Sequence, residues 1–427
     1  MENVLRLPQL AWHGVRNLEL TLPGRWKVEI CNMRGEFRKP LSEAEIRYAI
    51  RNPSGCLPIR MMAKNSKQVV IIFDDIQRAT RVSQIVPFVL EELAEAGIRD
   101  DQIRFIAATG CHAAMDRFDF VKKLGEDILK RFPVYSHNAF GNCVEAGITS
   151  RGTRVLVNAE VMACDFKIGI GSVVPHAFAG FGGGAKIILP GICHYETCLA
   201  FHRAGSRFAS MHQGRATGIG LIEDNPLRME MEEAAGMVGL NFKIDTIMNS
   251  YGETVAVYAG DLKHQYPEAI QDAREHYDTR QPENKDIVIA NAFAKVAECE
   301  SGLEVALPSI KKGGGEVVLI ANAPEGHVAH YLAGTWGRST RGSFQMRVAL
   351  APHVNRLIIY NEYPDLTLYD YFTNPEKVMI LSRWEEVLAL LEKAYPADAE
   401  VAVYPAADIQ YSSINSGSKF LSFSESN

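Results

Sequence analysis

Short, continuous apolar runs rich in β-branched residues recur along this chain, and they restrict its possible folds more than any other feature. The runs at residues 69–73 and 103–108 are each followed by a stretch with helical periodicity. Runs of this length are typical of strands buried on both faces of a parallel sheet. The same alternation resumes after residue 285. It predicts an α/β protein with two α/β domains, each built on a mostly parallel, doubly wound sheet.

Other local patterns complete the expected framework. Strands at 18–22 and 26–30 are expected to form an antiparallel lead-in, and Ser42 with Glu45 matches a helix capping box. Further helices are expected at 86–96, 119–131, 227–237, 264–276, 303–310 and 384–394. The last seventeen residues, from Tyr411, are rich in Ser and Asn and are expected to form an irregular tail.

The domain boundary is placed at a polar segment, residues 278–285. A length of 427 residues suggests two or three domains. We therefore expect an N-terminal domain at 1–277 and a C-terminal α/β domain at 278–427.

Composition excludes several classes of protein. The net charge is −6 and the isoelectric point is near 6.1, which argues against nucleic acid as the main partner. There is no apolar run of 18 residues and no evident secretory signal, so no membrane association is expected. The eight cysteines form no CxxC pair, a pattern typical of reduced thiols. These features predict a cytoplasmic protein.

Charged and imidazole side chains follow two of the predicted strands. Asp75 and Arg78 come just after the run at 69–73, and His112 follows the run at 103–108. Open α/β sheets bind ligands at the carboxyl ends of their strands, so these positions are candidates for a site. The alternative interpretations are a solvated charge cluster at a strand end and a structural histidine.

A glycine-rich stretch at 174–203 contains most of the remaining candidate functional residues. It contains Lys186 and the consecutive glycines Gly182, Gly183 and Gly184, together with three histidines. The Gly-Gly-Gly-Ala-Lys sequence resembles a phosphate loop, but the Walker pattern fails because an isoleucine follows the lysine. Phosphate binding stays open, whereas an ATPase is not expected.

The three histidines of this stretch are His176, His194 and His202. Neutral imidazole is both a general base near pH 7 and a good ligand for nickel, copper, zinc and iron. No HExxH spacing is present, so spacing alone does not establish a metal site. A partly desolvated Lys186 would have a lowered pKa and could act as a nucleophile. His194 is expected to have a structural or surface role.

These residues together resemble the nickel-dependent lactate racemase family of 2-hydroxyacid racemases and epimerases. The resemblance rests on Asp75-Ile-Gln-Arg78, on Ala108-Thr-Gly-Cys-His112, and on the spacing of His176, Lys186 and His202 around a Leu-Pro-Gly sequence. The family binds a nickel-pincer nucleotide, pyridinium-3,5-bisthiocarboxylic acid mononucleotide. The resemblance implies that the first domain carries catalysis and cofactor binding, with an active-site cleft between the two domains.

The resemblance also implies a role for each residue. Lys186 would form the covalent link to the cofactor, with Gly182, Gly183 and Gly184 close to it. His202 would be the protein ligand to nickel. His112 and His176 would be the acid/base pair. Asp75 and Arg78 would line the substrate site.

The implied reaction is reversible hydride transfer between the substrate α-carbon and the cofactor, through a transient 2-keto acid. The implied partners are a small 2-hydroxy acid or sugar acid and the proteins that make and deliver the cofactor. In a host without that biosynthesis, the cofactor would be absent.

The opening of the second domain departs from the family pattern. Lactate-acting members carry a Gly-Gly-Tyr-Pro-like segment there, followed by Gln and Lys contacts, whereas this chain has a different sequence at 291–300. Lys295 is a candidate for the cationic substrate contact, and Trp336 for a residue that covers the pocket. We therefore expect a substrate larger than lactate. The alternatives are a catalytically silent binding or regulatory protein of the same fold and a nucleotide-binding hydrolase.

Overall fold

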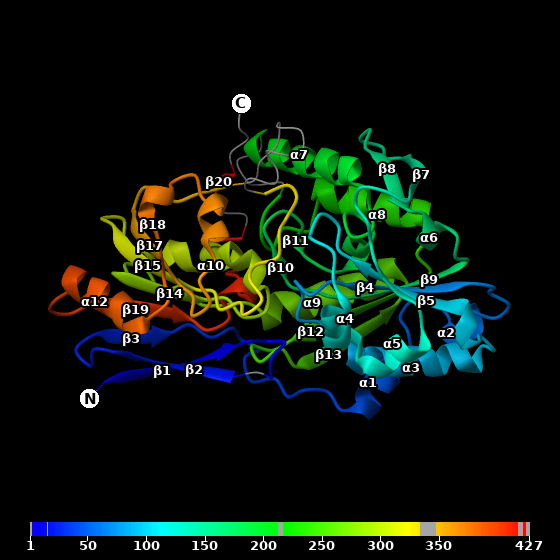
Figure 1. The fold of residues 1–427 in the computed structure, drawn as a ribbon, viewed down its shortest axis with the longest axis horizontal. Helices are drawn as coiled ribbons and strands as arrows, with labels where there is room; N and C mark the ends of the chain where they lie inside the picture. Colours follow the sequence, from blue (N-terminus) through cyan, green and yellow to red (C-terminus); the bar gives the residue numbers. More distant parts are fainter. Residues whose placement is uncertain (1, 15, 212–216, 334–346, 417–421, 424–427) are drawn as a thin grey trace. The chain divides into compact units, whose positions relative to one another are not determined.

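The computed structural model describes residues 2–14, 16–211, 217–333, 347–416 and 422–423. The chain forms two compact units, which we call the middle unit and the terminal unit (Figure 1). The middle unit contains residues 38–217 and 221–275, and the terminal unit contains residues 1–37, 218–220 and 276–427. Among the described residues, no helix combines the length and the apolar character needed to cross a membrane.

The middle unit is built on a six-stranded sheet with the strand order β13-β12-β9-β4-β5-β6. Its strands are β4 (Val69–Asp74), β5 (Ile103–Ala108), β6 (Val134–Ser136), β9 (Phe166–Ser172), β12 (Phe242–Met248) and β13 (Thr254–Gly260). All neighbours are parallel except β12 and β13. Strands β4, β9 and β12 are buried along their whole length, because both faces of the sheet are covered.

The helices of the first half of the middle unit share one core with the sheet. They are α1 (Glu43–Arg51), α2 (Ile59–Met62), α3 (Val82–Glu95), α4 (Arg117–Leu124) and α5 (Glu126–Arg131). Alternate residues of β4, such as Val69, Ile71 and Phe73, enter this core. The residues between them face the opposite side of the sheet, as the twofold periodicity of a strand requires.

The rest of the middle unit carries shorter elements. They are β7 (Cys143–Ile148), β8 (Arg154–Asn158), α6 (Ala159–Met162), β10 (Pro175–His176), β11 (Gly180–Phe181), the 3-10 helix η2 (Gly184–Ile187), α7 (Tyr195–Met211), α8 (Pro226–Val238) and α9 (Leu262–His276). A further 3-10 helix, η1 (Asp100–Gln102), precedes β5. Strands β7 and β8 pair with each other, and β10 pairs with β11.

The terminal unit has a six-stranded, fully parallel sheet with the order β18-β17-β15-β14-β19-β3. Its strands are β3 (Lys27–Ile30), β14 (Ile287–Asn291), β15 (Gly315–Ile320), β17 (Val354–Tyr360), β18 (Val378–Leu381) and β19 (Glu400–Tyr404). Alternate residues of β14 enter two different cores: Val288 and Ala290 enter one, and Ile287 and Ile289 enter the other.

Two sets of elements cover the faces of the terminal sheet. One core includes residues of η3 (Val296–Gly302), α10 (Leu303–Ala306), η4 (Leu307–Ser309), η5 (Leu366–Tyr371) and η7 (Ala407–Ile409). The other includes residues of α12 (Trp384–Ala394) and of the antiparallel pair β1 (Asn3–Gln9) and β2 (Arg16–Leu22). The remaining elements are η6 (Pro375–Lys377), β16 (Val348–Ala349) and β20 (Ser422–Phe423).

The predicted α/β fold with mainly parallel sheets is confirmed, and several local expectations were wrong. Residues 1–37 were placed in the first domain, but β3 pairs in parallel with β19 of the terminal sheet instead of forming an antiparallel lead-in. The helix expected at 119–131 is divided at Gly125, whose φ of +84° ends α4. Only 303–306 of the helix expected at 303–310 is α-helical. In the expected irregular tail, β20 pairs with β16.

Candidate active site

The order of strands in the middle sheet reverses between β4 and β9. From β4 the chain continues outward through β5 and β6, and β9 and β12 then lie on the other side of β4. Such a switch point leaves a crevice at the carboxyl ends of the strands, where doubly wound proteins bind ligands. Asp75 follows β4 directly, and the glycine-rich stretch follows β9. The structure therefore brings two of the predicted site segments to one edge of the sheet.

Two buried lysine–aspartate pairs lie at this edge. Lys123 donates to Asp74 at 2.6 Å, and Lys243 donates to Asp245 at 2.6 Å. Burial raises the pKa of Asp74 and lowers the pKa of Lys123, and the hydrogen bond between the two groups offsets part of both shifts. A Cβ atom on Gly171 of β9 would lie within 4 Å of Asp74, Lys243 and Asp245, so this glycine provides the space between the pairs. Paired buried charges of this kind are often found at functional sites.

His112 is held by Asp75. The His112 Nδ1 atom lies 2.5 Å from the Asp75 carboxylate, and the His112 side chain is 15% exposed. Burial alone raises the pKa of Asp75, but the charge and hydrogen bond of His112 and the nearby Arg78 outweigh it and bring the pKa below its ordinary value. The ionised Asp75 carboxylate accepts a hydrogen bond from the Nδ1–H group, so the neutral imidazole has its lone pair on Nε2. In the structure Asp75 orients His112, and its expected part in substrate binding stays a prediction.

His176 is held in the other tautomer. It ends β10, and its Nδ1 atom accepts hydrogen bonds from the backbone N–H groups of Phe178 and Ala179, each at 3.2 Å. An accepting Nδ1 carries no proton, so neutral His176 is protonated at Nε2. Asn225 fixes this hairpin from the start of α8: its side-chain amide donates to the Phe178 carbonyl at 2.9 Å and its oxygen caps the helix.

The glycine run is held by the protein itself. The Gly182 N–H donates to the Val174 carbonyl at 2.7 Å, and the Gly184 N–H donates to Asp245 at 3.0 Å. Gly183 has a φ of +72°, and a Cβ there would lie 2.7 Å from Asp245. The phosphate-loop interpretation is therefore not supported for the N–H groups of Gly182 and Gly184, because both already have acceptors. The glycines are needed for close backbone packing.

Arg228 and Tyr266 also hold the glycine run, through its backbone carbonyl groups. The Arg228 guanidinium lies 4.2 Å from the centre of the Tyr266 ring, and its Nη1 atom is 3.4 Å from the carbonyls of Phe181 and Gly183. The Tyr266 hydroxyl donates to the Gly182 carbonyl at 3.0 Å. These contacts fix the backbone immediately before η2.

Lys186 lies in η2 and is half-buried. The helix contacts β4, β9 and β12, so it lies over the switch point. The turn that follows η2 is fastened to the loop of His112, because the Gly110 N–H donates to the Gly191 carbonyl at 2.8 Å. Gly110 has a φ of +54°, and a Cβ there would lie 3.3 Å from the Pro190 carbonyl oxygen. The segments of Lys186 and His112 are therefore neighbours.

His202 lies on α7 and has a fixed ring orientation. Its Nδ1 atom lies 2.7 Å from the carbonyl oxygen of Cys198, which leaves the Nε2 lone pair as the ligating position. The Cys198 thiol is hydrogen-bonded to Cys111, and this bond and burial raise its pKa well above the ordinary value. The thiol pair connects α7 to the residue before His112. Within the described ranges, no three His, Cys, Asp or Glu side chains are grouped to hold a metal ion.

The remaining residues singled out from the sequence lie in different parts of the chain. Arg78 is half-buried in the middle unit, and its guanidinium donates to the Gln77 carbonyl at 3.0 Å. Lys295 belongs to the terminal unit, is 3% exposed, and its backbone N–H donates to Asp408 at 2.5 Å. Trp336 lies outside the described residues. His194 precedes α7, and its Nδ1 atom accepts from the backbone N–H of Glu196, in keeping with the structural role we expected.

Five residues that support the site were not predicted from the sequence: Lys123, Asn225, Arg228, Lys243 and Asp245. The sequence does contain evidence for three of them. Lys243 and Asp245 are charged residues at alternate positions of an otherwise apolar strand, so they must face the same side of the sheet. An Asn followed by Pro at the start of a helical pattern also predicts a cap. Nothing local marks Lys123 or Arg228 as buried.

Comparison with known proteins agrees with this architecture. Residues 13–214 match the lactate racemase N-terminal domain. The chain is 28% identical over 328 residues to the lactate racemase of Thermoanaerobacterium thermosaccharolyticum, covering 74% of each chain. It is 26% identical over 307 residues to the lactate racemase of Lactiplantibacillus plantarum, covering 70% of each chain.

Solved structures show the same fold. The lactate racemase apoprotein of Thermoanaerobacterium thermosaccharolyticum superposes with a TM-score of 0.71 at 21% identity, covering 96% of this chain and all (100%) of that one. A crystal structure of a Thermotoga maritima protein superposes with a TM-score of 0.61 at 18% identity, covering 87% and 98%. The chain is therefore similar in sequence to lactate racemases, with residues 13–214 matching their N-terminal domain, and it shares the fold of the lactate racemase apoprotein.

Proposed function

We propose that this chain is a racemase or epimerase of a 2-hydroxy acid, and that it acts through a nickel-pincer nucleotide tethered to Lys186. Similarity to lactate racemases, including the match of residues 13–214 to their N-terminal domain, supports an isomerase of this class. The α-C–H of a 2-hydroxy acid is very weakly acidic, because the adjacent carboxylate is already ionised. Moving a hydride instead of a proton avoids a dianionic intermediate.

The observation that carries the proposal is the pair of imidazoles in opposite tautomers. Asp75 holds His112 with its lone pair on Nε2, where it can take the proton of a substrate hydroxyl. Two backbone N–H groups hold His176 with its proton on Nε2, where it can donate. One imidazole is thus prepared as a base and the other as an acid. A racemase needs both, because each enantiomer is the substrate of one direction and the product of the other.

The residues present fit the cofactor that the family implies. His202 offers one imidazole nitrogen with its ring orientation set by the Cys198 carbonyl, and imidazole is a suitable ligand for nickel. Lys186 is half-buried in η2 beside a glycine run whose backbone leaves no room for a Cβ at Gly183. When bound, the cofactor would supply the hydride acceptor. We assign Lys186 to its covalent attachment and His202 to nickel.

Substrate binding is assigned to Arg78. Its guanidinium is a planar fork that matches a carboxylate, and it lies in the loop that also carries Asp75. Lys295 and Trp336 stay candidates for substrate contacts, and a 2-hydroxy acid larger than lactate is proposed. We further propose a cytoplasmic location, which the eight free cysteines support. The proposed partners are the proteins that make and deliver the cofactor.

The test is an isotope experiment on protein made in a host that produces the cofactor. Single enantiomers of 2-hydroxy acids and sugar acids, each deuterated at the α-carbon, are incubated with the enzyme, and the opposite configuration is measured together with its deuterium content. We expect the product to keep its α-deuterium, since a hydride returns to the same carbon. Complete exchange with solvent would contradict hydride transfer, and no product from any member of the panel would contradict a racemase.

A further inference from the structure

One buried side chain, that of Asn225 at the start of α8, is connected to the proposed acid through a single peptide unit. Its amide group donates to the carbonyl oxygens of Phe178 and Leu221, each at 2.9 Å. Its oxygen accepts from the backbone N–H of Leu227 at 3.0 Å. Both N–H donors and the oxygen of the side chain are therefore used, which fixes its orientation.

The peptide unit between Phe178 and Ala179 makes the connection. Its carbonyl accepts from Asn225, and its N–H, which belongs to Ala179, donates to the Nδ1 atom of His176 at 3.2 Å. This distance is at the long end of the hydrogen-bond range, so a small rotation of the unit would break the bond. A carbonyl that accepts a hydrogen bond also polarises the N–H of its own planar unit and strengthens the second bond. Asn225 therefore acts on a ring nitrogen of His176 through one rigid group.

The loop of Asn225 and the hairpin of His176 are packed closely against each other. Gly180 pairs with His176 between β10 and β11. Its φ is +74°, and a Cβ there would lie 2.2 Å from the carbonyl oxygen of Leu221. That oxygen is the second acceptor of the Asn225 amide. The hairpin is thus held by a hydrogen bond on one side and by direct backbone contact on the other.

A helix cap alone would not require asparagine at position 225. A cap needs one acceptor, which serine and threonine also supply. Two carbonyl oxygens that face one side chain require two donors beside that acceptor, and the asparagine amide has this set. The cap and the bond to Phe178 can therefore be separated by mutation.

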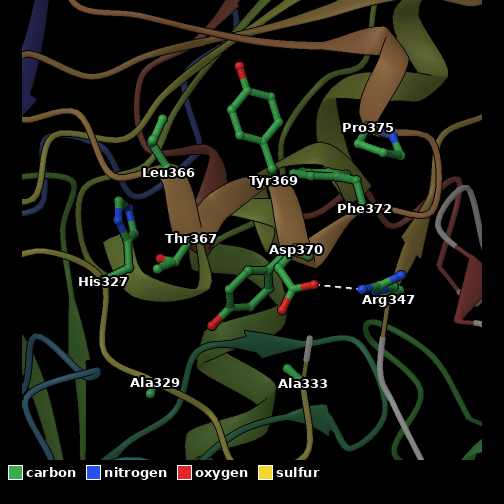
Figure 2. A pocket seen from close by; sticks show the side chains of 11 residues that line it. His327, Ala329, Ala333, Arg347, Leu366, Thr367, Tyr369, Asp370, Phe372 and Pro375 are labelled. Carbon is green, nitrogen blue, oxygen red and sulfur yellow. Dashed lines mark hydrogen bonds and ion pairs between the residues drawn. The ribbon is translucent and has the colours of Figure 1, made fainter. Parts of the chain in front are cut away.

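The surroundings of His176 differ from those of two other histidines. The Nδ1 atom of His112 faces Asp75, and the Nδ1 atom of His327, which lines the cavity in Figure 2, lies 3.3 Å from Asp365. An ionised carboxylate accepts a hydrogen bond, so it favours the proton on Nδ1. Backbone N–H groups donate, so they favour the proton of His176 on Nε2.

We propose that Asn225 is a positioning residue of the racemase reaction. Through the Phe178–Ala179 peptide unit it keeps His176 in the tautomer that has its proton on Nε2, where the proton can be donated. This inference rests on the proposed function, because it takes His176 as the acid. Since Asn225 acts through His176, turnover should depend on it more than substrate affinity does.

The first measurement is the tautomer of His176 in the full chain. The ring ¹⁵N chemical shifts of histidine-labelled protein are recorded at about pH 8.5, where an ordinary imidazole is neutral. His176→Asn identifies the signals of this residue. The measurement needs neither cofactor nor turnover, so its outcome does not depend on racemase activity.

The variants separate the cap from the bond to Phe178. Asn225→Ser keeps an acceptor for the cap and is too short to reach Phe178, and Asn225→Thr does the same while filling more of the space, in case the first variant does not fold. Asn158→Ser is the matched control. Asn158 also caps a helix, α6, and its amide lies 3.2 Å from the Nδ1 atom of His137, which has no part in the proposed reaction.

We expect His176 of the wild type to carry its proton on Nε2 alone, and both Asn225 variants to show a mixture of the two tautomers. His194, whose Nδ1 atom accepts from the Glu196 N–H at 3.2 Å, is the internal reference and should not change. In cofactor-loaded protein each Asn225 variant should lower kcat about tenfold, the effect of one lost hydrogen bond, with KM within about twofold of wild type. Asn158→Ser should keep the wild-type kcat.

A proton on Nδ1 of His176 in the wild type would overturn the proposal, as would a wild-type tautomer or a wild-type kcat in the Asn225 variants. Equal losses of kcat in Asn225→Ser and Asn158→Ser would also overturn it, because the effect would then come from general destabilisation. The expected tautomers in a chain without racemase activity would instead contradict the proposed function, while the connection from Asn225 to His176 would stand.

Discussion

The two parallel sheets of this chain have the same switch-point topology, yet their switch points carry different chemistry. In the middle unit the order reverses between β4 and β9, and the strand ends there carry Asp75, which holds His112. In the terminal unit the order reverses between β14 and β19. There the side-chain amide of Asn291 donates to the backbone carbonyls of Pro8 and Pro405 at 2.9 and 2.6 Å.

The terminal switch point is therefore used for structure. Asp408, which follows β19, accepts from the backbone N–H groups of Phe293 and Lys295, and burial raises its pKa despite the charge of Lys295. Its carboxylate fixes the backbone of the loop after β14, as Asp75 fixes an imidazole in the middle unit. The comparison shows that the fold provides the crevice, whereas the side chains at the strand ends decide whether chemistry is possible.

The largest expected effect is loss of the metal. We expect His202→Ala to lose nickel and all racemase activity, since His202 is the single protein ligand in the proposal. His194→Ala is the control, at the residue that precedes the same helix. It removes a cap and should cost about 1 kcal/mol of stability while keeping nickel. Metal analysis of the two purified variants checks this prediction, and nickel retained by His202→Ala would refute the assignment.

The next effect concerns the base. We expect Asp75→Asn to lower turnover by about 10³-fold, because an amide no longer secures the tautomer in which His112 accepts at Nε2. Asp261→Asn is a matched control, because Asp261 also lies 2.8 Å from the Nδ1 atom of a histidine, His264, but on the surface. Its turnover should be that of the wild type. Turnover of Asp75→Asn within a few-fold of wild type would remove Asp75 from the mechanism.

A third effect is on stability and pH. His137 is buried, its Nε2 atom lies 2.9 Å from the Cys193 carbonyl oxygen, and burial lowers its pKa to about 4. Between pH 6.5 and 4 the unfolded chain binds a proton that the folded chain does not. Stability present above pH 6.5 is therefore lost as the pH falls toward 4, by roughly 3 kcal/mol from this group. Denaturant unfolding should show a loss that is smaller in His137→Gln, and identical pH profiles would contradict the prediction.

The smallest effect tests the packing of the glycine run. A Cβ on Gly184 would lie 2.7 Å from the Arg228 guanidinium and from the Tyr266 ring, and its φ is +57°. We expect Gly184→Ala to reduce the free energy of unfolding by about 2 kcal/mol and to reduce cofactor attachment. Gly236→Ala, in helix α8 with open space around it, should be neutral or stabilising. Equal unfolding midpoints for the two variants would show that the run tolerates side chains.

The sequence predicted those features whose pattern lies within a few neighbouring residues. The capping box of Ser42 and Glu45 and the helix Trp384–Ala394 are as expected, because their patterns lie within a few residues. The pairing of β3 with β19 joins segments that are far apart in the chain. The four residues of β3 contain no local pattern that predicts the strand with which they pair. The site shows the same division. The segments that carry His112, His176, Lys186 and His202 were predicted from residue types and spacing. The bond between Asp75 and His112 and the two buried lysine–aspartate pairs were not predicted, because they form only in the tertiary structure.

The central claim, that the middle unit carries a tethered nickel cofactor while the terminal unit does not, has one direct measurement. The full chain is purified from a host that makes the cofactor, and peptide mass spectrometry is combined with metal analysis. We predict a mass adduct on the peptide that contains Lys186 and stoichiometric nickel. An unmodified Lys186 with no nickel in such a preparation would contradict the account.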